Sequence, residues 1–143
     1  MESPDQKLRD LKALWNRKRG SLSMPARTQF AIQDLQPWFG NLALIDIPSH
    51  TVRLCGTNLI SRFGRDATGW DIASLDEAVA ASVTPYIDRA QATKAPIEDV
   101  HNRIIDGYLV SYRELVLPLS DDADHVTMIL FGSYPIGARP AWR

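Results

Sequence analysis

The chain has 143 residues, one cysteine and nearly balanced charge, with 16 Lys and Arg against 17 Asp and Glu. That length suits a single domain, which buries about two thirds of its unfolded surface and needs neither a disulfide nor a metal to hold a core. The net charge of −1 argues against a generally basic nucleic-acid binder. With no signal-peptide pattern and no apolar run near the ~20 residues of a membrane span, we expect a cytoplasmic protein without a transmembrane segment.

The first 20 residues are expected to form an amphipathic helix that ends at Gly20. One apolar stripe runs along it at helical spacing, made of Leu8, Leu11, Leu14 and Trp15. Residues 1–20 carry six bases and three acids, a net of +3, whereas the other residues carry ten bases and fourteen acids, a net of −4. This basic segment is either a solvated helix face or a docking element for an acidic partner or a membrane surface.

The next part of the chain predicts short elements. A helical turn is expected within Gln33–Phe39, and two strands, Asn41–Ile47 and Thr51–Gly56, are expected to form a hairpin. Helical spacing through Leu59, Ile60 and Phe63 then predicts a short helix over Thr57–Phe63.

A longer helical region follows. Ser74 and Glu77 have the S-x-x-E spacing of a capping box, which predicts a helix beginning there. Because proline does not fit inside an ideal helix, we expect Thr84 and Pro85 to restart the helix.

Three strands are expected in the last third of the chain, over Glu98–Ile105, Tyr108–Leu117 and His125–Ser133. Asp106-Gly107 between the first two is a strong hairpin signal, because glycine adopts positive φ at little cost. The tail from Pro135 to Arg143 is expected to be loose. Two strand groups separated by helices predict an α+β fold with an antiparallel sheet. The helices would cover one face, and the N-terminal helix or a partner chain would cover the other.

Several segments in this order resemble a family of small standalone bacterial PAS-domain proteins. They are W-N-R-K-R-G (Trp15–Gly20), M-P-A-R (Met24–Arg27), L-I-D-I (Leu44–Ile47), V-R-L-C-G-T (Val52–Thr57), F-G-R-D-A-T-G (Phe63–Gly69) and L-V-L-P-L-S (Leu115–Ser120). The resemblance implies a PAS-like five-stranded antiparallel sheet with a small cavity beneath the central helices. It also implies a sensory or interaction role in signalling. We expect an N-terminal helix and linker over residues 1–27, a PAS-like domain over 28–134 and a tail over 135–143.

Arg53 stands within an apolar strand, where strict alternation places Thr51, Arg53 and Cys55 on one face and Val52 and Leu54 on the other. A guanidinium in such a place needs an anionic partner. One interpretation is an ion pair with Asp46 or Glu114, and the other is an anchor for a carboxylate ligand.

The candidate ligand-binding residues also include four aromatic residues and a methionine, which would supply apolar area and polar handles to a pocket. They are Trp70, Tyr86, Tyr108, Tyr112 and Met128. The alternative for each of them is an ordinary core position, which is the usual place for such side chains.

No cofactor is assigned. The flavin-binding segment of light-sensing PAS domains is absent, and the long helix lacks the histidine that haem-binding relatives commonly use. The lone Cys55 excludes an intrachain disulfide, and the three histidines lack metal-ligand spacing.

Three functions remain open. The first is a non-enzymatic sensor or adaptor that binds a small, partly apolar ligand, a protein partner, or both. The second is a pure protein-interaction or dimerisation module with a filled core. The third is a small α+β enzyme, which would need a cavity holding a His or carboxylate with a perturbed pKa. A homodimer is also expected, supported by the apolar stripe of the N-terminal helix.

Overall fold

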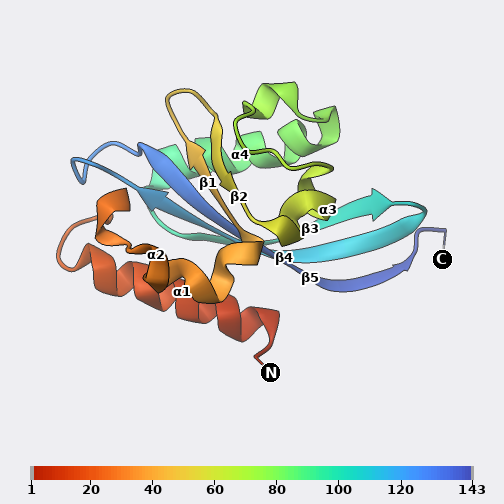
Figure 1. The fold of residues 1–143 in the computed structure, drawn as a ribbon, viewed down its shortest axis with the longest axis horizontal. Helices are drawn as coiled ribbons and strands as arrows, with labels where there is room; N and C mark the ends of the chain where they lie inside the picture. The colour runs from red at the N-terminus through yellow and green to blue at the C-terminus, as the bar shows by residue number, and fades with distance from the viewer. Residues whose placement is uncertain (1, 143) are drawn as a thin grey trace.

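A five-stranded antiparallel sheet in the order β2-β1-β5-β4-β3 forms the centre of the computed structural model, which describes residues 2–142 (Figure 1). The strands are β1 (Leu42–Asp46), β2 (Val52–Cys55), β3 (Ile97–Ile105), β4 (Tyr108–Leu119) and β5 (Met128–Pro140). The predicted α+β class and five-stranded antiparallel sheet are confirmed.

Helices lie on both faces of this sheet (Figure 1). The α-helices are α1 (Pro4–Arg19), α2 (Ile32–Leu35), α3 (Ile60–Phe63) and α4 (Glu77–Thr93). Short 3-10 turns are η1 (Arg27–Gln29), η2 (Gln36–Asn41), η3 (Thr57–Leu59) and η4 (Ile72–Ser74). Side chains of α3 and α4 pack on one face, called here the inner face, and α1 packs on the other, the outer face. None of the helices formed by residues 2–142 has the length and apolar character needed to span a bilayer.

The helix α1 covers the outer face of its own sheet. Ser3 caps its first turn, and the Trp15 indole N–H donates to the carbonyl of Pro118 in β4 at 2.8 Å. The fit is close at Gly132 of β5, where an added Cβ would lie 3.1 Å from the Leu8 side chain. The predicted stripe is therefore buried within one chain.

Some of the basic charge of α1 is matched inside the chain. Lys12 pairs with Glu98 of β3 at 3.1 Å, and Lys18 pairs with Asp34 of α2 at 3.1 Å. All four side chains are partly exposed, so these pairs orient the helix more than they stabilise it.

The helix α4 departs from the sequence-based expectation at both predicted signals. It begins at Glu77 with Asp76 at the N-cap, while Ser74 closes η4 and donates its N–H to the Asp71 carboxylate at 2.9 Å. The predicted capping box and the predicted restart are therefore wrong, because α4 runs unbroken through Pro85. Pro85 lies on the exposed side of the helix, where water can satisfy the backbone carbonyl that the proline leaves without a donor.

The hairpin between β3 and β4 has the turn that its sequence predicts. Asp106 and Gly107 both have positive φ, 50° and 80°, as a two-residue type I′ turn requires. Beyond it, β5 continues to Pro140 and pairs with the far end of β4. The predicted loose tail is therefore wrong over residues 135–140, and Arg143 lies outside the described residues.

A bulge in β2 changes the faces predicted around Arg53. Val52 lies opposite Ile45 and Leu54 lies opposite Leu44, with a shift of register between the two pairs. Because Leu44 and Ile45 are consecutive and point to opposite faces, Val52 and Leu54 do so as well. The shared face predicted for them is wrong, and Arg53 is exposed.

Candidate functional site

A buried ion pair lies at the centre of the inner sheet face. The residues Arg62 of α3 and Glu114 of β4 are 0% and 1% exposed. Arg62 Nε lies 2.8 Å from Glu114 Oε2, and Nη2 lies 3.3 Å from Oε1, so the contact is bidentate. Two charges held this far from water depend on each other and on further hydrogen bonds for their stability.

Three hydroxyl groups supply those hydrogen bonds. The Tyr86 hydroxyl donates to Glu114 Oε1 at 3.0 Å, Ser133 donates to Oε2 at 2.6 Å, and Ser82 accepts from Arg62 Nη2 at 3.1 Å. Burial, and then the charge of Glu114, raise the pKa of Tyr86 well above its ordinary value, so the phenol stays protonated and keeps donating. The third nitrogen of this guanidinium, Arg62 Nη1, is buried and finds no hydrogen-bond partner within residues 2–142.

Aromatic rings surround the guanidinium of Arg62. Its central carbon lies 5.8 Å from the ring centre of Phe63, 5.9 Å from that of Tyr112 and 5.6 Å from that of Phe131. Ring faces attract a cation, most strongly where water is excluded. Side chains therefore fill the middle of the space between the sheet and α3.

Two adjoining hollows open at the surface beside this pair, between α4 and β3. One has a volume of about 400 Å³ and the other about 370 Å³, and both are lined by Ala78 and His101. We call them together the α4–β3 groove. Ser82 and Tyr86 line the larger hollow and also bind the ion pair, so two residues belong to both the groove and the buried network.

His101 is the imidazole ring that lines this groove. It stacks on Tyr112, with ring centres 6.5 Å apart. Burial, followed by the positive charge of Arg62, lowers the pKa of His101, so the ring is neutral near pH 7. At the rim of the groove, Arg89 of α4 pairs with Asp99 of β3 at 3.5 Å.

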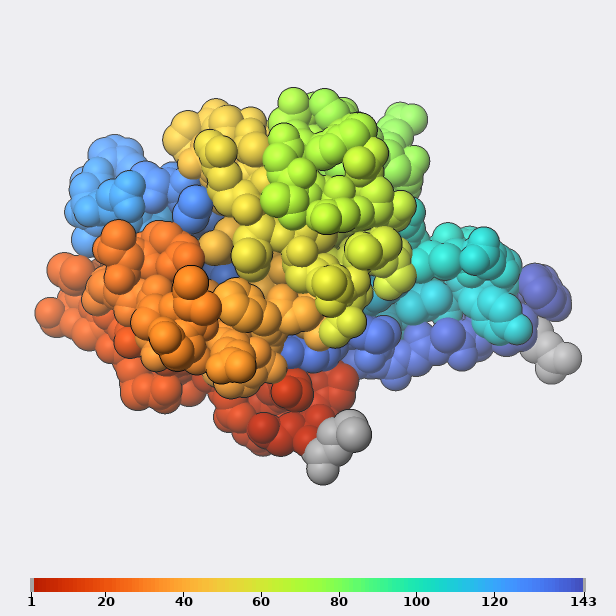
Figure 2. All heavy atoms as spheres, viewed as in Figure 1, coloured from red at the N-terminus to blue at the C-terminus, as the bar shows by residue number. Residues whose placement is uncertain are grey.

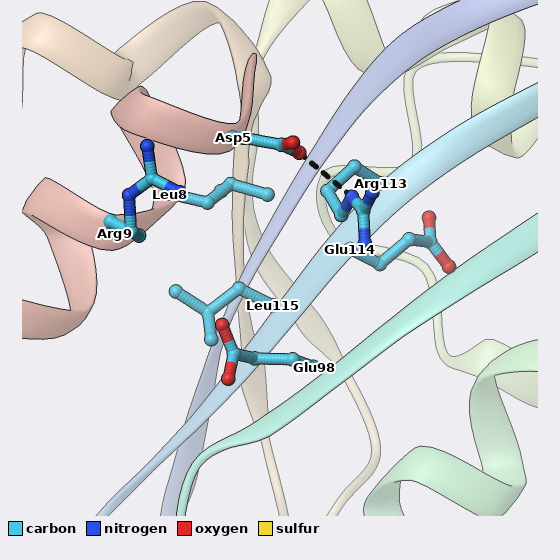
Figure 3. A pocket seen from close by; sticks show the side chains of 7 residues that line it. All are labelled: Asp5, Leu8, Arg9, Glu98, Arg113, Glu114 and Leu115. Carbon is cyan, nitrogen blue, oxygen red and sulfur yellow. Dashed lines mark ion pairs between the residues drawn. The ribbon is translucent and has the colours of Figure 1, made fainter. Parts of the chain in front are cut away.

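A smaller pocket of about 170 Å³ lies on the outer face, between α1 and β4 (Figure 3). An ion pair crosses it, with Arg113 Nε 2.8 Å from Asp5 Oδ1. Figure 3 shows Arg113 pointing toward α1 and Glu114 pointing away from it. Consecutive residues of β4 thus hold one ion pair on each face of the sheet.

Arg53, the predicted anchor, stands apart from this network. Glu114 binds Arg62, so the suggested pair of Arg53 with Glu114 is wrong. At Asp46, the other suggested partner, the Ser49 hydroxyl lowers the carboxyl pKa most, and the charge of Arg53 adds a smaller effect.

Two of the other predicted ligand-binding residues, Tyr86 and Tyr112, lie beside the ion pair. The other three lie outside it: Trp70, which stacks on Arg65, Tyr108 at the β3–β4 turn, and Met128 at the start of β5. A ligand role for any of the six stays a prediction.

The sequence pattern does not single out Arg62. It favours Leu59, Ile60 and Phe63 as the apolar face of the short helix, whereas the structure buries Leu59, Arg62 and Phe63 and leaves Ile60 exposed. Its position could have indicated that Arg62 is buried, because Arg62 stands three residues after Leu59 and so shares its helix face. A charged residue on an apolar face predicts a buried partner.

Metal and thiol chemistry find little support here. Within residues 2–142, no three His, Cys, Asp or Glu side chains are grouped so that they could hold a metal ion. Burial raises the pKa of the Cys55 thiol, which keeps it in its less reactive protonated form near neutral pH.

Comparison with known families gives one match, to a family described as PAS domain, over residues 3–134. No curated protein sequence matches the chain. The matched span includes α1 as well as the whole inner-face network.

Solved structures share the fold at low identity. The PAS domain of BvgS from Bordetella pertussis superimposes with a TM-score of 0.54 at 14% identity, over 94% of this chain and 89% of that one. A sensory box sensor histidine kinase structure from Vibrio cholerae gives 0.55 at 12%, over 94% and 96%. VqmA bound to DPO gives 0.56 at 11%, over 74% of this chain and 58% of that one. At these identities the likeness shows the fold alone.

Proposed function

The chain belongs to the PAS domain family, and on that basis we propose that it is a cytoplasmic, non-enzymatic sensor or adaptor domain in bacterial signalling. Its input would be a small, partly apolar ligand held in the α4–β3 groove. One observation carries this proposal: Ser82 and Tyr86 line the groove and also hydrogen-bond to the buried Arg62–Glu114 pair.

The groove has the composition that such a ligand needs. The apolar residues Ala81 and Pro85 line it beside Ser82 and Tyr86, which carry hydroxyl groups. A polar group of the ligand would exchange hydrogen bonds with these hydroxyls, while its apolar part would cover the alanine and proline side chains.

The response would be a shift of population. A ligand that draws the Tyr86 hydroxyl away from Glu114 favours an arrangement in which α4 sits differently on β4. A protein partner would then recognise that arrangement. VqmA, which has the same fold, was solved bound to DPO, and this supports a sensory role by analogy.

Native mass spectrometry of gently purified protein, followed by thermal-shift screening of a metabolite library, tests this proposal. Ala78 is exposed and lines both hollows, so Ala78→Trp fills the groove without touching the ion pair. Ala92→Trp, on an exposed position of α4 outside the groove lining, is the control. We expect a ligand that the wild type and Ala92→Trp bind and that Ala78→Trp loses. An empty protein with no thermal shift across the library, or equal binding by all three, would contradict the proposal.

The filled centre of the inner face favours a second function, a protein-interaction module without a ligand. Phe63, Phe131 and the ion pair occupy the space in which relatives with a small-molecule site would need a cavity. For this function, a partner captured equally by wild type and Ala78→Trp, with no small molecule bound, is the expected result.

The enzyme alternative finds less support. His101 has the lowered pKa that such a site would need. The Ser82 hydroxyl, which lines the same hollow, is already engaged, because it donates to the carbonyl of Val79 at 2.9 Å and accepts from Arg62.

A further inference from the structure

A second copy of the chain needs a surface other than the one that its sequence suggests. The stripe of α1 is buried against its own sheet, so it offers no apolar face to a partner. The strand β3 is different, because it lies at the end of the sheet and, among the strands of residues 2–142, pairs with β4 alone. Figure 2 shows the far ends of β3, β4 and β5 projecting beyond the helices, in cyan and blue.

The free edge of β3 is long and regular. All nine residues from Ile97 to Ile105 pair with β4 without a bulge. Since Ile105 and Tyr108 close a two-residue type I′ turn, they exchange backbone hydrogen bonds, and every second residue back along β3 does the same. The residues between them direct their N–H and C=O groups to the open side: Glu98, Val100, Asn102 and Ile104.

One contact supports this assignment directly. The N–H of Val100 donates to the carboxylate of its neighbour Asp99 at 2.8 Å, rather than to a β4 carbonyl. The free edge thus has backbone donors and acceptors in a straight row, which is what an added strand requires.

We propose that this edge pairs with the β3 strand of a second copy, antiparallel and centred on His101. In that register, Asp99 of each copy lies opposite Arg103 of the other, because both residues stand two positions from the centre. All nine residues are paired, and Ile97 faces Ile105 of the second copy. Shifting the pairing by two residues along the strand would place Asp99 opposite His101 or Ile105 instead. It would also shorten the overlap of the two strands.

The inner face supports this charge pairing. Asp99 reaches Arg89 at 3.5 Å and Arg103 reaches Asp76 at 3.7 Å, so both side chains lie on the inner face of the sheet. In the dimer, four charges would alternate in sign across the axis, from Arg89 and Asp99 of one copy to Arg103 and Asp76 of the second. Opposite charges facing each other across strands stabilise the pairing.

The outer face supports it through exposed apolar side chains. Val100 is 42% and Ile104 is 64% exposed in the isolated chain. In the proposed register, Val100 lies diagonally across from Ile104 of the second copy, so both would leave water on pairing.

Disulfide trapping tests the register. In a Cys55→Ser background, His101→Cys places the two thiols on the axis, at a non-hydrogen-bonded pair with Cα atoms about 4.5 Å apart, within disulfide reach. Asn102→Cys is the control, because its two copies would lie more than about 7 Å apart. We expect a crosslinked dimer from the first variant and little from the second. Equal crosslinking of both variants, or none from His101→Cys, would overturn the register.

Charge reversal tests the partner. In a dimer of the Asp99→Arg variant, two positive charges would face each other at each contact between positions 99 and 103. In a dimer of the Arg103→Asp variant, two negative charges would do so. Each variant alone should therefore weaken self-association on the order of tenfold. A mixture of the two single variants restores both opposite-charge contacts and should form heterodimers, as sedimentation velocity across a dilution series would show. Circular dichroism confirms that each variant is folded. A wild type that is monomeric at every concentration, or single variants that dimerise as tightly as the wild type, would overturn the proposal.

Discussion

Arg62 and Glu114, 52 residues apart in the chain, meet at 2.8 Å with neither side chain exposed to water. This contact joins the single turn of α3 to β4, the strand between β5 and β3. Removing one partner leaves the other as an uncompensated buried charge, which is far more costly than losing a surface pair. The pair is therefore the place where one substitution should most affect the fold.

Glu114→Gln keeps the shape of the side chain and removes its charge. We expect the free energy of unfolding to fall by about 3 to 5 kcal/mol, because Arg62 remains buried without a counter-charge. Urea denaturation followed by circular dichroism measures it. The control is Glu98→Gln, whose carboxylate pairs with Lys12 at the surface and should lose less than about 1 kcal/mol.

Adding Arg62→Met to Glu114→Gln should recover part of the loss, because no unpaired charge then remains buried. If the double variant instead loses as much free energy of unfolding as the two single variants combined, the charges do not act as a pair.

Gly56 should not tolerate a side chain. An added Cβ would lie 2.3 Å from the carbonyl oxygens of Phe39 and Gly40, and both are backbone atoms that cannot rotate away. Gly56→Ala should cost at least about 2 kcal/mol through overpacking. Gly137→Ala in β5 meets no atom within 4 Å and should be neutral or slightly stabilising. Thermal melts of both variants measure the contrast, and similar melting temperatures would contradict it.

The docking of α1 should contribute much of the stability of the domain. Leu11 is fully buried between α1 and the sheet, so Leu11→Ala should cost about 2 to 5 kcal/mol. Leu22 is 48% exposed just beyond the helix, and Leu22→Ala should change the free energy of unfolding by no more than about 0.5 kcal/mol. If α1 were only a loosely attached segment, Leu11→Ala would melt like the control.

His101 should make the fold sensitive to mild acid. Its pKa is lowered in the folded chain from an ordinary value of 6.5, so below that pH the unfolded chain binds more protons than the folded one. The stability that the neutral imidazole gives the fold is fully present above pH 6.5. It is lost as the pH falls through the folded-state pKa.

The measurement is urea denaturation at pH 7 and at pH 5. We expect His101→Gln to lose less stability than the wild type between the two pH values, because glutamine does not titrate. The groups that face His101 in the folded chain include Arg62, Arg103, Asp99 and Glu114, and they stay unchanged in the variant. Equal losses in both proteins would contradict the prediction.

Local sequence signals predict the hairpins and the stripe of α1, because each depends on neighbouring residues. Asp106-Gly107 requires nothing beyond its own two backbone conformations to form a turn. The stripe from Leu8 to Trp15 predicts a buried helix face, although the sequence leaves open whether its own sheet or a partner chain covers that face.

Features that depend on distant residues are not predicted. The burial of Arg62 requires Glu114, and nothing in the short helix indicates a carboxylate on a strand far along the chain. Pro85 by itself predicts a break in the helix. The packing of α4 on the sheet nevertheless outweighs the single hydrogen bond that the proline removes. The tail becomes strand because β4 is long enough to pair with it.

Arg103 links the free edge of β3 to the buried pair. Its guanidinium donates to the backbone carbonyl of Arg62, one of the carbonyls that the single turn of α3 leaves without a helical partner. An Arg103 drawn toward a neighbouring molecule would release that carbonyl, and α3 would lose a contact that holds it in register with Glu114. A single side chain thus connects the edge strand β3 to the helix that carries Arg62, so a contact at the edge that moved Arg103 would also affect how α3 is held.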